Sequence, residues 1–231
     1  MSKHYPHHHA DLEQIISQQC PFKPTKLTVS TDLTYQIHAS NTLALLQWLK
    51  ESMTCQFNQL IDITAVDYLH YGESEWKTDN ANTGYSRATT ALKASSHPTE
   101  PDTRFVVVYQ LLSTVYNWRI RIHALLNKNP PETSSITTLW PNANWLERET
   151  YDMFGIVFHQ HPDLRRILTD YGFKGYPFRK DFPLIGRTEM RYDAREKRVV
   201  YQPVTIENRV SVGKTIRDDS RYTHSKGSPE Q

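Results

Sequence analysis

Paired acidic residues and paired histidines are the side chains of this sequence that could perform acid–base chemistry or bind a metal. Glu147 and Glu149 are two residues apart on a predicted helix, so they point to different faces and cannot flank one scissile bond. His159 and His161 form an HxH pattern that could ligate zinc from a strand, but no cysteine is nearby and no third ligand is evident. A structural or surface role is therefore the better interpretation of both pairs.

Redox and nucleotide chemistry need other patterns. Iron–sulfur clusters are usually held by four closely spaced cysteine thiolates, whereas this sequence has two cysteines, Cys20 and Cys55. The phosphate-cradling patterns GxGxxG and GxxxxGK are absent. We therefore expect no cluster, flavin or nucleotide in this chain. His7–His9 could bind a metal ion, although a solvated stretch is the more ordinary interpretation.

The composition is that of a nearly neutral globular chain. Its 231 residues include 27 lysines and arginines against 25 acidic residues, which gives no general excess of positive charge for nucleic acid. No run approaches the roughly 18–20 apolar residues of a membrane-spanning helix. The two cysteines suit a reducing compartment. The first residues lack a signal core or a transit helix, so we expect the chain to be used where it is made.

The densest group of charged, aromatic and glycine residues runs from Asn142 to Pro183. Its first part predicts a helix over Trp145–Phe154, with Asn144 as the N-cap and Glu147 completing a capping box. Residues at helical spacing on one face of this helix are Leu146, Thr150, Met153 and Phe154.

Three further features belong to this helix and to the segment after it. Arg148 and Asp152 lie one turn apart and predict a surface ion pair, and Gly155 predicts a left-handed C-cap. Beyond the glycine, prolines and glycines enforce an extended, turning path. We expect this path to bury its aromatic residues mainly against a partner, with Arg179 or Lys180 paired to the partner's carboxylates. These aromatic residues are Phe173, Tyr176, Phe178 and Phe182.

Hydrophobic periodicity predicts the other elements. Helices are predicted at Asp11–Gln19, at Leu43–Ser52 with Asn41 or Thr42 as cap, and at Ile136–Trp140 with Ser134 or Ser135 as cap. A half-buried strand or a hairpin is predicted at Lys26–Ala39. Strands are predicted at Phe57–Val66, Arg104–Ser113 and Trp118–Leu126, with a hairpin turn at Asn117, and a further hairpin is predicted from Met190–Asp193 and Arg198–Gln202.

Helices and strands alternate without a βαβ rhythm, which predicts an α+β fold. We expect a single domain with a mixed β-sheet and flanking helices, followed by an extended C-terminal tail. The α+β domain covers residues 1–158 and contains a polar insertion at 72–102. An extended docking segment follows at 159–205, and residues 206–231 form a flexible polar tail.

The stretch Asn142–Pro183 and its surroundings resemble the signature of the thirty-kilodalton subunit family of complex I, known in bacteria as the C subunit of NADH-quinone oxidoreductase. The matching residues are Glu147-Arg148-Glu149, Asp152–Ile156, His161–Leu168 and Arg179–Leu184, and a weaker likeness covers roughly residues 10–205. The family more often has other residues at Tyr151, Gln160, Tyr176 and Phe178, which concerns packing rather than membership.

The resemblance implies a structural, non-catalytic subunit in the peripheral arm of a proton-translocating NADH:quinone oxidoreductase. It implies contact with other hydrophilic-arm subunits, chiefly the quinone-site subunit (the forty-nine-kilodalton or D-type subunit), and FMN and Fe–S clusters in those partners rather than in this chain. The implied place is the cytoplasmic side of a bacterial inner membrane, reached only through the complex, with the matrix side of the mitochondrial inner membrane as the alternative. The positions that carry the signature, and that we expect to hold the fold and the interface, are Glu147, Arg148, Glu149, Asp152, Gly155, Pro162, Arg165, Arg166, Arg179, Lys180, Asp181 and Pro183.

The residues alone leave one other function open. Between His159 and Arg198 there are 10 lysines and arginines against 6 acidic residues, interleaved with aromatic residues. This composition suits a stand-alone module that binds RNA or the ribosome. The acidic residues interrupt any continuous basic stripe, which favours a protein partner over nucleic acid.

Overall fold

The structure is a computed structural model that describes residues 9–27, 33–69, 71, 73–74, 92–93, 103–127 and 129–206. The chain divides into two compact units, one made of residues 1–69 and 99–186 and the other of residues 70–98 and 187–231. His7, His8, most of the predicted insertion and residues 207–231 of the predicted tail lie outside the described residues. The domain boundaries at residues 158 and 205 stay predictions.

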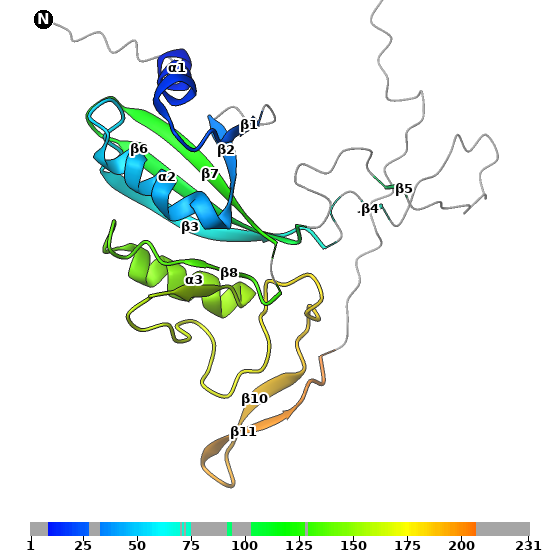
Figure 1. Cartoon of the computed structure of the whole chain (residues 1–231). Coiled ribbons are helices and arrows are strands. Elements are labelled where there is room, and N and C mark those ends of the chain that lie inside the picture. The colour runs from blue at the N-terminus through cyan, green and yellow to red at the C-terminus, as the bar shows by residue number, and fades with distance from the viewer. Residues whose placement is uncertain are drawn as a thin grey trace, which may run out of the picture. The chain divides into compact units, whose positions relative to one another are not determined.

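The first unit is built on a five-stranded sheet with the order β1–β2–β7–β6–β3 (Figure 1). Its strands are β1 (Thr25–Leu27), β2 (Thr34–His38), β3 (Gln59–Asp67), β6 (Phe105–Ser113) and β7 (Trp118–Leu126). β2 runs parallel to β7, and the other neighbours are antiparallel. The sheet is therefore mixed, as the sequence predicts. Asn117 has a φ of 55° in the turn between β6 and β7, which confirms the predicted hairpin.

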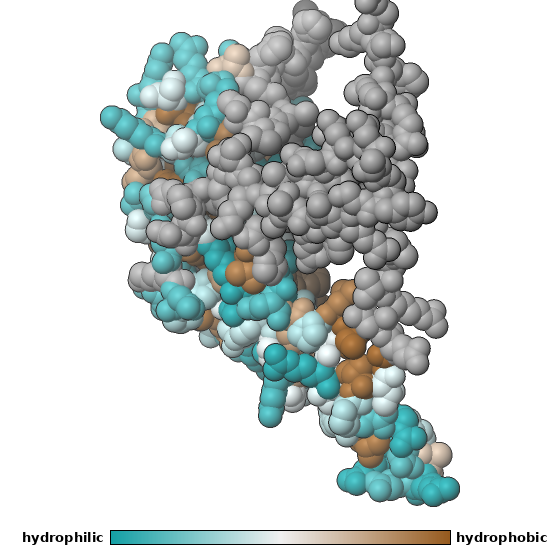
Figure 2. Space-filling view, turned by 90° about the vertical axis from the view of Figure 1, so that its right-hand side faces the viewer, coloured by the Kyte–Doolittle hydropathy of each residue, from teal (hydrophilic) through white to brown (hydrophobic). Residues whose placement is uncertain are grey.

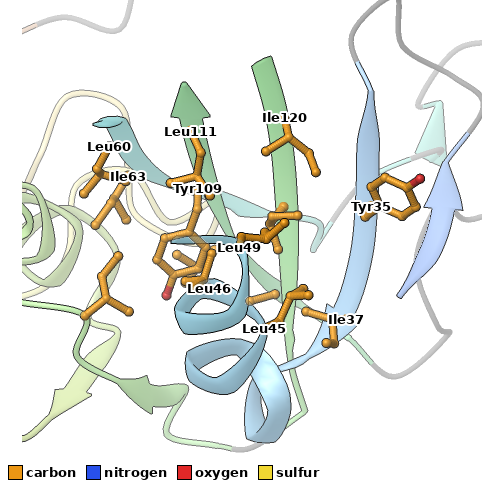
Figure 3. Packing of buried hydrophobic residues seen from close by; sticks show 14 of the residues in the cluster. Tyr35, Ile37, Leu45, Leu46, Leu49, Leu60, Ile63, Tyr109, Leu111 and Ile120 are labelled. Atoms are coloured by element: carbon orange, nitrogen blue, oxygen red, sulfur yellow. The ribbon is translucent and has the colours of Figure 1, made fainter. Parts of the chain in front are cut away.

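Three helices contribute to one hydrophobic core with the sheet. They are α1 (His9–Gln19), α2 (Ala39–Glu51) and α3 (Ala143–Phe154). The core joins Leu12 of α1 and Met153 of α3 to Tyr109 of β6. The predicted core residues of α2 are buried, and Figure 3 shows them beside Tyr109 and strand residues of the sheet: they are Leu45, Leu46 and Leu49. Val106 and Val108 belong to a second, smaller cluster, because successive strand residues point to opposite faces.

Two local predictions are wrong. α2 begins at Ala39, and Thr42 lies inside its first turn with Oγ1 donating to the His38 carbonyl at 3.2 Å, so neither Asn41 nor Thr42 is the cap. Residues 136–140 form a single turn instead of a helix, since five residues are too few to repay helix nucleation. The residues before this turn form β8 (Glu132–Ser134), which pairs in parallel with β9 (Val157–His159).

α3 covers the outer edge of β3, the last strand of the sheet. Asn142, just before α3, donates from Nδ2 to the Leu60 carbonyl at 2.9 Å, and Thr150 Oγ1 donates to the Ile63 carbonyl at 3.4 Å. An exposed edge strand offers unpaired backbone groups to other chains. The helix therefore blocks such pairing here. The same two hydrogen bonds fix α3, which carries the first residues of the signature, against β3.

The second unit contains two short antiparallel pairs within its described residues. β4 (Glu73–Ser74) pairs with β5 (Leu92–Lys93), and β10 (Thr188–Asp193) pairs with β11 (Arg198–Pro203). The latter pair confirms the predicted C-terminal hairpin. None of the helices in the described ranges is long and apolar enough to span a membrane.

Candidate functional site

The signature begins on α3, whose ends are only partly those predicted. The helix starts at Ala143, and Asn142 occupies the N-cap position without a side-chain hydrogen bond that caps the helix. The predicted capping box of Asn144 and Glu147 is therefore wrong, because the Glu147 carboxylate is used elsewhere. Gly155 has φ 73° and ψ 30°, and its N–H donates to the Tyr151 carbonyl at 2.8 Å, which confirms the left-handed C-cap.

Asp152 is the first anchor of the segment that comes after α3. Its side chain is fully buried, and Oδ2 accepts the backbone N–H groups of Ile167, Leu168 and Thr169 at 3.1, 2.8 and 2.8 Å. Oδ1 accepts the Thr169 hydroxyl at 2.5 Å and Arg166 Nη1 at 2.8 Å. Burial alone would raise the pKa of this carboxyl, but the hydrogen bonds from Thr169 and from the backbone outweigh burial and lower it to about 2. Asp152 is therefore ionised and structural.

The Arg166 guanidinium extends this anchor toward the aromatic residues of the segment. Nη2 donates to the Gly175 carbonyl at 2.9 Å, and the guanidinium carbon lies 5.0 Å from the centre of the Tyr176 ring and 5.8 Å from that of Phe173. One cation thus links the carboxylate to the backbone and to two rings.

The predicted surface pair of Arg148 and Asp152 is wrong. Asp152 points into the protein, and Arg148 donates to the carbonyls of Arg165 and Arg166 at 3.2 and 3.5 Å. Helical spacing brings the two residues to neighbouring positions but does not show which of them faces a folded segment. The Arg148 side chain therefore still holds the loop that Asp152 holds, by binding backbone carbonyls of that loop.

Asp67, at the end of β3, is the second anchor. Its buried carboxylate accepts two hydrogen bonds from Arg104, both at 2.9 Å, and the N–H groups of Leu69 and Lys180 at 3.0 and 2.9 Å. Burial would raise the pKa of Asp67, but the bonds from Arg104 and these N–H groups lower it below its ordinary value. Arg104 also donates to Asp181 at 2.9 Å. No local pattern indicates that Asp67 and Arg104 act together with the signature, so sequence reasoning missed both.

Arg179 holds the segment against the end of α3. Its Nε donates to the Phe154 carbonyl at 2.5 Å, and its guanidinium lies 4.5 Å from the Tyr176 ring centre and 5.1 Å from that of Phe105. A Cβ at Gly155 would stand 2.5 Å from Tyr176 and 2.6 Å from Arg179. The glycine is needed both for its positive φ and for this close approach.

The aromatic residues of the segment pack mostly on this chain. The ring centres of Phe173 and Phe182 are 5.7 Å apart, and those of Phe178 and Phe154 are 5.6 Å apart. The Tyr176 ring packs edge-on against Tyr151 of α3. Phe173, Tyr176 and Phe182 are half-buried, whereas Phe178 is exposed. The prediction that all four are buried mainly against a partner is therefore wrong for three of them.

Other apolar side chains of the segment remain exposed, and Figure 2 shows hydrophobic side chains reaching the surface of the molecule. Leu184 is 98% and Tyr171 97% exposed. A hollow of about 520 Å³ lies between the end of β3 and residues 177–184, and Lys180 lines it. Within the described ranges, Lys180 and Lys174, which is also exposed, form no ion pair. We call this outward-facing set, Tyr171, Lys174, Phe178, Lys180 and Leu184, the docking surface.

Glu147 has a separate environment. It is fully buried, and its carboxylate accepts the Ile136 N–H and the Ser135 hydroxyl, both at 2.7 Å. Burial raises its pKa to about 7, because these two hydrogen bonds offset only part of the cost of burying the charge. Glu149 is exposed, so the two glutamates face different environments, as expected.

The two histidines are also apart. His159 pairs with Glu132 at 2.8 Å, and His161 lies within 3.2 Å of the Asn144 carbonyl. No group of three or more potential ligands among the described residues is placed to hold a metal ion. The remaining signature residues are exposed or half-buried: they are Pro162, Arg165, Asp181 and Pro183. Arg165 forms an ion pair with Asp163.

The family described as "Respiratory-chain NADH dehydrogenase, 30 Kd subunit" matches residues 35–188, well over half of the sequence. The chain belongs to this family. The resemblance inferred from the signature is thereby confirmed. A member of this family is one subunit of a respiratory enzyme complex.

Similar proteins of this family come from bacteria. The NADH-quinone oxidoreductase C subunit of Legionella pneumophila (strain Corby) is 46% identical over 198 residues, which cover 85% of this chain and 87% of the relative. The protein of the same name from Coxiella burnetii (strain RSA 331 / Henzerling II) is 47% identical over 199 residues, covering 86% and 87%. A solved chain of the membrane-bound sulfane sulfur reductase, an archaeal respiratory membrane complex, aligns with a TM-score of 0.53 and 20% identity over 77% of this chain and 86% of that chain, which is a likeness of fold alone.

Proposed function

We propose that this chain is a structural subunit in the peripheral arm of a bacterial proton-translocating NADH:quinone oxidoreductase and that it carries no redox centre. The observation that carries the proposal is that residues 160–186, the signature segment, are fixed to this chain by some contacts and expose other side chains. The buried carboxylates Asp152 and Asp67 fix the segment to its own unit, while Tyr171, Phe178 and Leu184 face outward. Exposed apolar side chains with nearby lysines suit a protein partner.

The cysteines support the absence of a cluster held by this chain. Cys20 and Cys55 are both buried, and burial raises the pKa of each thiol, which disfavours the thiolate that metals require. Electrons would then pass from NADH to quinone through FMN and Fe–S clusters of partner subunits. We expect the isolated chain to be colourless. We also expect a Cys20→Ser, Cys55→Ser double variant to assemble into a complex with unchanged NADH:quinone activity; a loss of electron transfer in that variant would contradict the proposal.

We propose the quinone-site subunit, of the forty-nine-kilodalton or D type, as the partner of the docking surface. A partner that presents apolar side chains and carboxylates would cover Leu184 and pair with Lys180. The bacterial relatives support a bacterial complex, and within it we propose a place on the cytoplasmic side of the inner membrane, held there through the complex. These relatives give no support to the alternative of an RNA-binding module.

The test replaces Leu184 by aspartate in a tagged full-length chain expressed with the other subunits. We expect the amount of partner subunits that co-purify, measured as flavin and iron per tagged chain, to fall at least ten-fold. Met53→Asp is the matched control, because Met53 is 77% exposed but lies after α2, outside the signature. Normal co-purification of the Leu184 variant would show that docking does not use this surface.

A further inference from the structure

The β10–β11 hairpin separates apolar from polar residues by face. Met190 pairs with Tyr201, and Tyr192 pairs with Val199. Alternate residues of a strand share one face, so these four side chains lie together on one side of the hairpin, which we call the hairpin face. The residues of the opposite side are mainly polar or charged: Glu189, Arg191, Asp193, Arg198, Val200 and Gln202.

The hairpin face is largely open within the described part of the chain. Its four side chains are between 55% and 62% exposed. A two-stranded hairpin alone is at best marginally stable in water and needs a third strand or a packing surface. Strict alternation that leaves Met190, Tyr192 and Val199 mostly in water is therefore the pattern of a surface that becomes covered on assembly.

The charges beside the hairpin face indicate the chemistry of the partner. Arg198 pairs with Glu196 at 2.5 Å, and Arg191 lies 4.0 Å from Asp193. Three other cations of this region, Arg187, Arg195 and Lys197, form no ion pair with any residue that the structure describes. The charge left unpaired around the hairpin face is therefore positive, and a complementary surface is acidic.

We infer that the hairpin face is a second docking surface and that it binds an apolar strip flanked by carboxylates on another subunit of the complex. This inference rests on the proposed function, since membership of a family of respiratory-complex subunits supplies the setting. Tyrosine and methionine are enriched at the centres of protein interfaces. A membrane surface fits less well, because lipid-binding patches usually carry about 4–8 clustered cations and this hairpin mixes both signs.

The experiment uses two adjacent valines that face opposite sides of β11. Val199→Asp places a charge on the hairpin face, and Val200→Asp places the same charge on the polar side. Each tagged full-length variant is expressed with the other subunits, and flavin and iron per tagged chain are measured. We expect at least a ten-fold loss for Val199→Asp and less than a two-fold change for Val200→Asp, with unchanged circular dichroism of both isolated chains. Equal losses, or no loss in either variant, would overturn the inference.

Further measurements identify what covers the hairpin face. Hydrogen exchange of residues 188–203 should be fast in the isolated chain and slow in the complex. Exchange that is already slow in the isolated chain and becomes fast on deletion of 207–231 would assign the face to this chain's own terminus. Flotation of the isolated chain with vesicles containing one-third phosphatidylserine, lost in Val199→Asp, would assign it to a membrane. A dimer of the isolated chain that Val199→Asp dissociates would assign it to a second copy, and each of these last three results refutes a partner subunit.

The Leu184 and Val199 variants separate this inference from the proposed function. Normal assembly of Val199→Asp together with failure of Leu184→Asp would refute the second docking surface and leave the proposed function intact. The reverse result would place docking on the hairpin face and remove it from the signature segment.

Discussion

Replacement of Asp152 by alanine should lower the free energy of unfolding of the isolated chain by about 3–5 kcal/mol, the cost of breaking a buried ion pair by removing one partner. The structure shows why the cost is high. The variant leaves the Arg166 guanidinium, the Thr169 hydroxyl and three backbone N–H groups without their acceptor. Water that enters the loop can restore some of these bonds, which keeps the total well below the sum of five separate losses.

Asp152→Asn tests whether the charge or only the shape matters. The asparagine oxygen can replace Oδ2 toward the three N–H groups, but its NH₂ group then faces Arg166, which is also a donor. We therefore expect a loss of about 2–3 kcal/mol, within the range for hydrogen bonds to charged groups. The pKa of Asp152 is lowered to about 2 in the folded chain, so its stabilisation is complete above the unfolded value of about 3.9 and is lost as the pH falls toward 2.

Urea denaturation at pH 7 of the isolated full-length chain measures these differences. Glu149→Ala, a change on the same helix at a side chain that reaches solvent, is the control, with an expected effect within about 0.5 kcal/mol. Hydrogen exchange should show residues 160–186 opening first in the Asp152 variants. A loss below about 1 kcal/mol for Asp152→Ala would refute the reasoning, because the segment would then be held mainly by its other contacts.

Two other substitutions and one loop replacement test separate parts of the structure. Glu147 has a folded pKa of about 7, above its unfolded value, so the folded chain binds the proton more tightly and stability should fall as the pH rises from about 4.5 to 7; in pH-dependent denaturation Glu147→Gln should remove this slope. Gly155→Val should cost at least about 1 kcal/mol from positive φ alone, and more because Tyr176 must move, which thermal unfolding will detect. Replacing residues 72–102 by a short Gly/Ser link should leave circular dichroism and cooperative unfolding intact, because the flanking ends of β3 and β6 are hydrogen-bonded neighbours.

The elements that could be predicted well from the sequence are those set by local periodicity. β7 has its predicted bounds, and β6 lacks only the first predicted residue. Both strands alternate strongly or are continuously apolar, which leaves their period unambiguous. Gly155 was predictable because a glycine after a helical run has one common use. The short helix at 136–140 was wrong because capping residues alone do not make so brief a helix stable.

The site was less predictable because its bonds connect distant parts of the sequence. The Lys180 N–H reaches Asp67 across 113 residues, and Asp152 reaches a loop 14 to 17 residues away. Helical spacing predicted an ion pair between Asp152 and Arg148, which is nearer in the sequence. A local rule cannot show that Asp152 instead binds a loop that folds back onto the helix. The signature therefore contained Asp152, Arg166 and Arg179, but it did not indicate what each of them contacts, and Asp67 and Arg104 lie outside it.

The three buried carboxylates differ in charge state because burial raises the pKa of Glu147 most, while the two aspartates accept more hydrogen bonds. Asp152 accepts five hydrogen bonds, one of them from an arginine, and Asp67 accepts four, two of them from Arg104. Glu147 accepts two neutral donors, and its nearest basic nitrogen, on His161, is 3.9 Å away. An ionised carboxylate accepts strong hydrogen bonds from backbone N–H groups that would otherwise be unpaired. A carboxyl that is half protonated at neutral pH accepts weaker ones. The two aspartates therefore fix the docking segment, and Glu147 joins α3 to the turn after β8 in a way that depends on pH.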